Sequence, residues 1–137
     1  MQKNILLLFC ALLILLLQGC ALMMGKPSHS LSIVTEPADA SIIVKDEKGL
    51  EVFKGQSPVI INLEKSAGPY KGGKVYMVTL SKPGYKTKIV PLLPVVSGYY
   101  GFGNMMTDGI GYFIDPYYGN MYDLSPPVIN TKLQKEN

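Results

Sequence analysis

Between residues 31 and 92 the chain alternates short apolar runs with polar turn residues. The clearest run is Lys74–Ser81, in which Tyr76, Val78 and Leu80 occupy every second position. Residues spaced in this way face one side of a β-strand, so the run predicts a half-buried strand. Similar runs occupy residues 31–35, 41–45, 50–53, 59–63, 86–92 and 128–133. No segment between residues 31 and 92 repeats its apolar residues with the period and length of a helix.

The segments between these runs have the composition of turns. Pro37, Gly49, Pro58 and the pair Pro83-Gly84 interrupt the apolar pattern, because proline cannot donate to a β-ladder and glycine accepts positive φ. Short strands with a turn roughly every 8–12 residues are typical of an antiparallel β-sandwich. We therefore predict a small all-β sandwich followed by a short glycine- and aromatic-rich subdomain that has room for one short helix. The predicted core consists of Ile33, Ile42, Val44, Val59, Ile61, Val78, Leu80 and Ile89.

A longer apolar run stands at the start of the chain. Residues 5–17 are uninterrupted by any polar side chain, and Lys3 precedes them. Thirteen residues are too few to span a bilayer as a helix, which takes about 20. A basic start followed by a short apolar stretch is the pattern of a secretory signal peptide, which we place at residues 1–19. An uncleaved anchor, or a signal cut elsewhere, is the alternative.

The end of this run resembles the lipobox of bacterial lipoproteins. The motif is Leu17-Gln18-Gly19-Cys20, which has the Leu-x-Gly-Cys pattern of that family. The resemblance implies cleavage between Gly19 and Cys20 and acylation of Cys20, with palmitate among the acyl chains. It also implies a lipid-anchored protein of the cell envelope. Because Ala21 is not aspartate, the sorting habit of this family implies the outer membrane, with the domain facing the periplasm. Residues 20–30 are then the lipidated N-terminus and tether.

Three motifs in the middle of the chain resemble the PEGA domain. They are Pro37-Ala38-Asp39-Ala40, then Gly55-x-Ser57-Pro58, and then Lys82-Pro83-Gly84-Tyr85. The resemblance covers residues 31–92. It implies a small β-sandwich module of surface and envelope proteins that binds or scaffolds, and it supplies no catalytic residues to transfer.

Residues 93–133 differ in composition from the preceding domain. Six of the nine tyrosines and two of the four phenylalanines lie between Ile89 and Thr131, where there is no lysine. We predict a short helix or hairpin at Asn104–Ile114, with small residues four apart at positions 103, 107 and 111 allowing close packing. Its candidate contact residues, for a membrane or a protein partner, are Met105, Met106, Ile110, Phe113, Tyr117 and Tyr118. Alternatively, the segment folds over one face of the sandwich, and its tyrosines fill core and rim.

The last part of this segment resembles the C-terminal tail of small bacterial lipoproteins. The similar residues are Asp115-Pro116, Gly119, Met121-Tyr122, Leu124 and Pro126. The tail has no assigned chemistry to transfer. We predict a turn at Asp115–Gly119, where proline sets φ and glycine relieves the backbone. Residues 134–137 are predicted to be a polar tail.

Charge and reactive residues narrow the functional classes. All 13 basic residues are lysines, and the formal net charge is only +3, which argues against a nucleic-acid partner. Both cysteines lie within residues 1–20 and the single histidine, His29, lies in the tether. The sequence therefore predicts no metal site, no cofactor and no enzymatic activity.

Two functional hypotheses remain open. In the first, the protein is a structural or accessory component that recognises another envelope protein through sheet edges or its tyrosine-rich face. In the second, it is a carbohydrate- or peptidoglycan-binding module in which exposed tyrosines stack on sugar rings. The candidate residues for stacking are Tyr99, Tyr100, Tyr117 and Tyr118.

Overall fold

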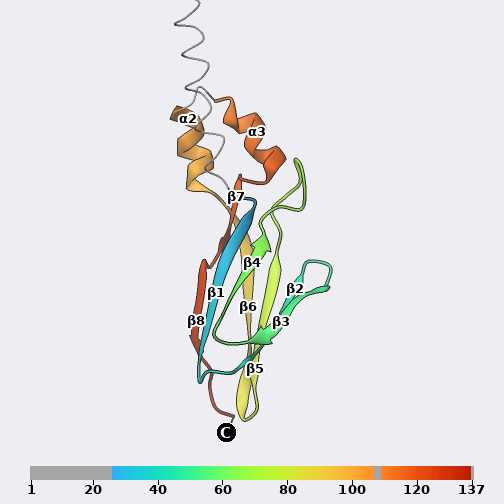
Figure 1. Cartoon of the computed structure of the whole chain (residues 1–137), viewed down its shortest axis with the longest axis vertical. Helices are drawn as coiled ribbons and strands as arrows, with labels where there is room; N and C mark the ends of the chain where they lie inside the picture. Colours follow the sequence, from blue (N-terminus) through green and yellow to red (C-terminus); the bar gives the residue numbers. More distant parts are fainter. Residues whose placement is uncertain (1–25, 107–108, 137) are drawn as a thin grey trace, which may run out of the picture.

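The described residues form a β-sandwich that carries a helical unit at one end (Figure 1). The structure is a computed structural model, and it describes residues 26–106 and 109–136. Within these ranges the strands are β1 (Ser28–Glu36), β2 (Ser41–Asp46), β3 (Glu51–Gln56), β4 (Val59–Glu64), β5 (Tyr76–Lys82), β6 (Tyr85–Val96), β7 (Tyr122–Ser125) and β8 (Val128–Lys132). The predicted all-β sandwich is confirmed.

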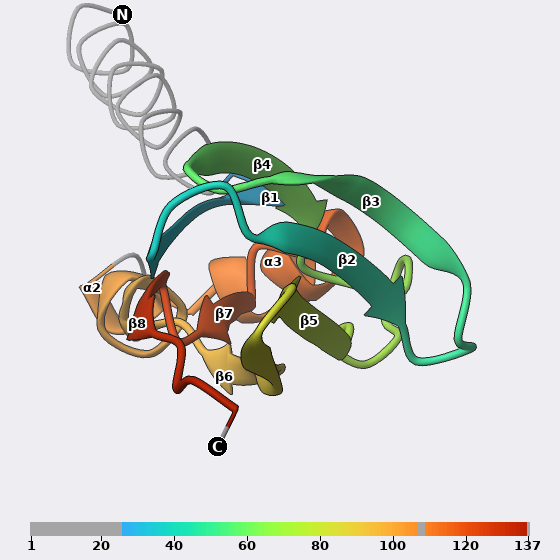
Figure 2. The same ribbon diagram turned by 90° about the horizontal axis from the view of Figure 1, so that it is seen from below.

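The strands form two sheets, with the orders β4-β1-β8 and β3-β2-β5-β6-β7 (Figure 2). Their pairs are antiparallel except β1 and β8, which run parallel. The reason lies in the connection at Pro126-Pro127. Since β7 and β8 run in the same direction, the chain changes sheet at these prolines without reversing, and β8 arrives parallel to β1.

Alternate residues of the strands face each other between the sheets and form the core. The largest buried apolar residues are Leu31, Ile33, Ile42, Val44, Ile61, Tyr76, Val78, Leu80, Leu92, Leu124, Ile129 and Leu133. Six of the eight predicted core residues are among the buried residues, and Val59 packs against them partly buried. Ile89 was predicted wrongly: it is 56% exposed, because Val90 and Leu92 are the residues of β6 that face inward.

Strand β6 is longer than its sequence predicts. The two prolines at positions 91 and 94 suggested an end at Leu92, yet the strand continues to Val96. It pairs with β5 up to Leu92 and with β7 from Leu93 onward. Each proline therefore lies where β6 has a neighbour on one side only, so a missing N–H is tolerated as it is on an edge strand.

Strand β1 runs the length of its sheet from one end of the sandwich to the other, so its direction is used to name the two ends (Figure 1). We call the end where β1 begins the entry end and the end where it finishes the far end. Strand β1 begins at Ser28, three residues earlier than predicted, so part of the predicted tether belongs to the sheet. The described chain starts at Lys26, and the carbonyl of Pro27 accepts a 3.1 Å hydrogen bond from the Lys65 amide.

The three motifs of the central domain meet at the far end. The Ser57 hydroxyl accepts a 3.1 Å hydrogen bond from the Ala40 amide and bonds the hydroxyl of Thr35. The Lys82 ammonium donates to the carbonyl of Ala38. These hydrogen bonds connect residues that are 17 and 44 positions apart in the sequence to the turn between β1 and β2.

Candidate functional site

The helical unit lies on the entry end, beyond β6 and β7 (Figure 1). We call its described residues, 97–106 and 109–121, the cap. It contains the π-helical segment η2 (Tyr99–Gly103), the short helix α2 (Asn104–Met106) and the helix α3 (Gly111–Tyr118). A 2.9 Å hydrogen bond from the Ser97 amide to the Met121 carbonyl closes its base. The cap is therefore an insertion between two paired strands.

The inside of the cap is polar. Asn104 is only 5% exposed, and its Nδ2 atom donates a 2.7 Å hydrogen bond to Oδ2 of Asp115. The backbone carbonyl of Asn104 accepts a 3.0 Å bond from the Gly109 amide. Gly111 lies directly against this asparagine, and an added Cβ would stand 1.6 Å from Oδ1 of Asn104. The two halves of the cap thus meet at an amide, a carboxylate and a glycine.

Two tyrosines form a second link between the halves. The rings of Tyr100 and Tyr112 lie edge to face, with centroids 5.3 Å apart. The Tyr112 hydroxyl donates to the Gly101 carbonyl at 2.9 Å, and the Tyr100 hydroxyl lies 3.4 Å from the Tyr112 carbonyl. That carbonyl is the helical acceptor that Pro116, which has no N–H, leaves without its usual donor. Tyr100 therefore compensates for the proline inside α3.

The predicted turn at residues 115–119 was wrong, because these residues close helix α3. Gly119 ends the helix with φ of 76°, and its amide bonds the carbonyl of Asp115. This left-handed ending is the common glycine cap of helices. An added Cβ at Gly119 would stand 2.8 Å from Cβ of Ser66, so the glycine also lets the helix approach the loop between β4 and β5.

The large apolar side chains of the cap point outward. Neither η2 nor α3, both described in full, contains a buried residue. Phe113 is 76% exposed and Met105 is 73% exposed. The exposed apolar residues of the cap are Tyr99, Phe102, Met105, Ile110, Tyr112, Phe113, Tyr117 and Tyr118. The alternative in which these tyrosines fill the core of the sandwich was wrong.

Five of the six predicted contact residues have side chains that the structure describes, and all five belong to the cap. Met105, Ile110, Phe113, Tyr117 and Tyr118 are all exposed on the cap. The side chain of Met106 lies outside the described residues, as do Thr107, Gly19 and Cys20. Sequence reasoning missed Phe102, which stands between Gly101 and Gly103. The glycines suggested close packing there, whereas a Cβ at either one would meet nothing within 4 Å.

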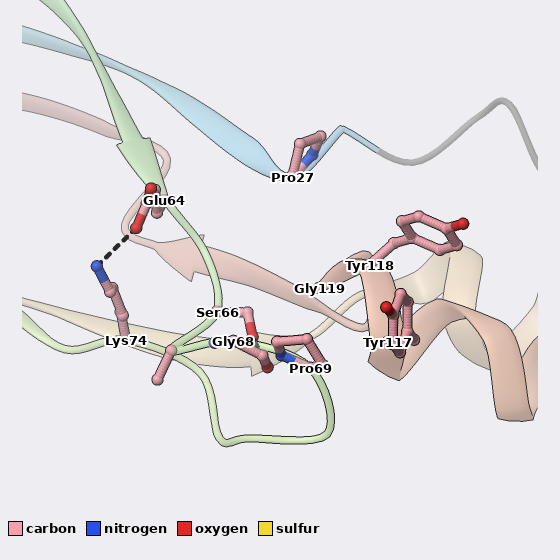
Figure 3. A pocket seen from close by; sticks show the side chains of 10 residues that line it. Pro27, Glu64, Ser66, Gly68, Pro69, Lys74, Tyr117, Tyr118 and Gly119 are labelled. Carbon is pink, nitrogen blue, oxygen red and sulfur yellow. Dashed lines mark hydrogen bonds and ion pairs between the residues drawn. The ribbon is translucent and has the colours of Figure 1, made fainter.

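A groove of about 360 Å³ runs between the end of α3 and the loop that follows β4 (Figure 3). Tyr117 and Tyr118 line one side, and the ion pair of Lys74 with Glu64, at 2.7 Å, lies at the other. The two rings meet edge to face, with centroids 5.1 Å apart, so they do not form one flat platform. Tyr99 and Tyr100 do not line this groove.

Charged groups beneath the cap are paired. The side chain of Lys65 is 7% exposed, and its ammonium lies 2.9 Å from Oδ1 of Asp123. The hydrogen bond from Lys74 to Glu64 raises the pKa of the lysine. Burial raises the pKa of the Tyr76 hydroxyl, which donates to the Glu64 carbonyl at 2.9 Å. These contacts hold the ends of β4, β5 and β7 together under the cap.

Residues 26–106 and 109–136 contain no group of three or more His, Cys, Asp or Glu side chains placed to hold a metal ion. Among the helices that the structure describes, none combines the length and the apolar composition needed to cross a membrane.

Comparison with protein-family models, with curated proteins and with solved structures gave no match for the chain.

Proposed function

We propose that the protein is a lipid-anchored component of the bacterial cell envelope, fixed through Cys20, with a non-enzymatic binding or structural role. The observation that supports this most directly is the lipobox-like motif Leu17-Gln18-Gly19-Cys20 at the end of the apolar run of residues 5–17. Strand β1 begins at the end that carries the cap, and Lys26, just before it, is six Cα–Cα steps from Cys20, with five residues between them. Six such steps reach at most about 20 Å. An acylated Cys20 would therefore hold the cap near the membrane and direct the sandwich away from it.

In this arrangement the protein is anchored in the outer membrane, and the PEGA-like sandwich presents its far end and its sheet edges to the periplasm. A groove of about 620 Å³ lies at the far end and is lined by Glu36, Tyr85, Lys132 and Lys135, among others. Strand β3 is an edge strand, paired with β2 only. Unpaired edges accept an added strand from another protein. We propose another envelope protein as the partner of these surfaces.

The anchor is tested on the full chain produced in a bacterial host. We expect labelled palmitate to enter the protein and the intact mass to match cleavage before Cys20 with acylation. The Cys20→Ser variant should lose the label and leave the membrane fraction, and separated membranes should place the unaltered protein in the outer one. An unacylated protein with its leader intact would contradict the proposal.

The groove beside Tyr117 supports a second candidate function, which is binding of carbohydrate or cell-wall polymer. Tyrosine faces stack on sugar rings, and the Glu64 and Lys74 side chains supply polar groups within the same groove. Retention of the purified protein by peptidoglycan, lost in Tyr117→Ala and kept in Tyr99→Ala, would favour this function. A protein captured by cross-linking, without retention by peptidoglycan, would favour the structural role.

A further inference from the structure

The cap has the inverse of the usual distribution of polar and apolar side chains. Its buried side chains include Asn104, which bonds Asp115, whereas Phe113 and Met105 are among the most exposed residues. A unit in water normally buries its large apolar side chains and leaves amides and carboxylates outside. Exposed apolar patches of this kind mark sites that are covered by a partner or a membrane.

The position of the cap favours a membrane over a protein partner as the surface that covers it. The chain reaches the sandwich at Lys26, and Lys65 and the α3 end of the groove lie beside that entry point. Because the tether from Cys20 spans about 20 Å at most, a lipid on Cys20 keeps the exposed face within reach of the bilayer. A protein partner that covered the cap would have to fit between the cap and the bilayer.

The charges agree with an interfacial position. Among the described cap residues the one charged side chain is Asp115, and its carboxylate accepts the bond from Asn104, while Asp108 of the same segment lies outside the described residues. Exposed lysines stand at the margin, at Lys26 and at Lys71 of the adjoining loop. A unit with exposed apolar and aromatic side chains, and with lysines on the segments beside it, suits the headgroup region, where tyrosines and lysines are favoured.

We propose that the cap is a second membrane contact, which inserts its exposed aromatic and methionine side chains into the outer part of one leaflet. The helices are too short to cross, so the depth is that of an interfacial segment, about 5–10 Å below the headgroups. The bound sandwich then stands upright on the bilayer with its far end outward. This inference rests on the proposed lipid anchor for its geometry, but its physical test is independent of the anchor.

The chain contains no tryptophan, so a single introduced tryptophan reports its own surroundings. We choose Phe113→Trp in the cap and Ile89→Trp on β6 as the matched control. Both sites are exposed. Ile89 lies seven residues before the cap end of β6, about 23 Å along the strand. The full chain is purified from host membranes, its intact mass is measured, and it is added to phosphatidylethanolamine–phosphatidylglycerol vesicles with or without bromine near the top of the acyl chains.

We expect Trp fluorescence of Phe113→Trp to shift to the blue on vesicles and to lose most of its intensity with the brominated lipids. The Ile89→Trp control should show neither change. If the Phe113→Trp protein floats with the vesicles but is not quenched, the cap is covered by something other than lipid and the inference is overturned.

The mass measurement separates this inference from the proposed anchor. Acyl chains on Cys20 without quenching in the cap leave the anchor standing and overturn the second contact. Quenching in the cap of a protein without acyl chains supports the contact and contradicts the anchor. A protein with neither acyl chains nor quenching contradicts both.

Discussion

The Nδ2 atom of Asn104 lies 2.7 Å from Oδ2 of Asp115 and links the two halves of the cap from within. Gly111 lies against this asparagine, and many of the large side chains that the structure describes in the cap are exposed. The stability of the cap therefore depends on a few hydrogen bonds in a small buried space. A hydrogen bond to a charged group contributes about 1.5–3 kcal/mol when it is well formed.

We predict that Gly111→Ala opens the cap without unfolding the sandwich. The new Cβ would lie 1.6 Å from Oδ1 of Asn104, so this side chain must rotate and lose its bond to Asp115. Amide hydrogens of the cap, including that of Gly109, should exchange about tenfold faster or more, whereas those of β2 and β5 should be unchanged. Gly101→Ala is the control, since its Cβ meets nothing within 4 Å. Equal exchange in both variants would refute the role assigned to this glycine.

The ion pair of Lys65 and Asp123, whose side chains are 7% and 42% exposed, should matter more than the exposed pair of Lys132 and Glu36. Asp123→Ala removes the hydrogen-bond partner of the largely buried Lys65 side chain, and we expect the free energy of unfolding to fall by about 1.5–3 kcal/mol. Glu36→Ala breaks a 3.4 Å pair whose two side chains are both largely exposed, and should cost less than about 1 kcal/mol. Urea unfolding measures both losses, provided that the slope of the unfolding free energy against urea concentration is the same as in the unaltered protein. Equal losses would show that Lys65 finds another partner or water.

Ser57→Ala should destabilise the far end. The substitution removes the acceptor of the Ala40 amide, and Ala40 is completely buried. An unsatisfied buried amide costs about 1–3 kcal/mol. Ser30→Ala is the matched control, because the Ser30 hydroxyl bonds Asn62 at an exposed position and its loss should cost under about 1 kcal/mol. Thermal unfolding of the two variants side by side would show whether the far-end turn depends on this hydroxyl.

Alkaline pH should weaken the fold through Tyr76 and Lys74. Burial raises the pKa of Tyr76, and the Glu64 carboxylate raises that of Lys74. Above about pH 10 the unfolded chain releases these protons more readily than the folded chain does, so stability is complete below this pH and falls as pH rises. Tyr76→Phe removes the tyrosine contribution and should flatten the decline in melting temperature. A decline as steep as that of the unaltered protein would place the alkaline sensitivity elsewhere.

The strands could be predicted because their apolar alternation is local. Tyr76, Val78 and Leu80 face the core as the sequence indicates. The length of β6 could not be predicted, since a proline interrupts a strand only where a neighbouring strand lies on the side that its N–H would face. At Pro91 and Pro94 one side is open. The parallel pairing of β1 with β8 depends on a crossing between sheets, which no local pattern reports.

The cap was predicted in part. The sequence indicated an apolar surface, and most of its members, such as Phe113 and Met105, are exposed together. It did not indicate that Asn104 would lie inside, because an asparagine between glycine and methionine reads as a surface or turn residue. The Tyr100 hydroxyl likewise lies 3.4 Å from the Tyr112 carbonyl, the helical acceptor that Pro116 cannot serve, and no local pattern indicates this contact across 12 positions.

Strand β1 both continues from the tether and occupies the middle of the three-stranded sheet, between antiparallel β4 and parallel β8. If Cys20 is fixed in a membrane and a partner pulls on the far end, the tension runs along β1. The hydrogen bonds to both neighbours are then loaded in shear and must yield together, instead of opening one after another as in a peeled hairpin. Anchored in this way, the sandwich would serve as a mechanically resistant strut between the bilayer and whatever its far end holds.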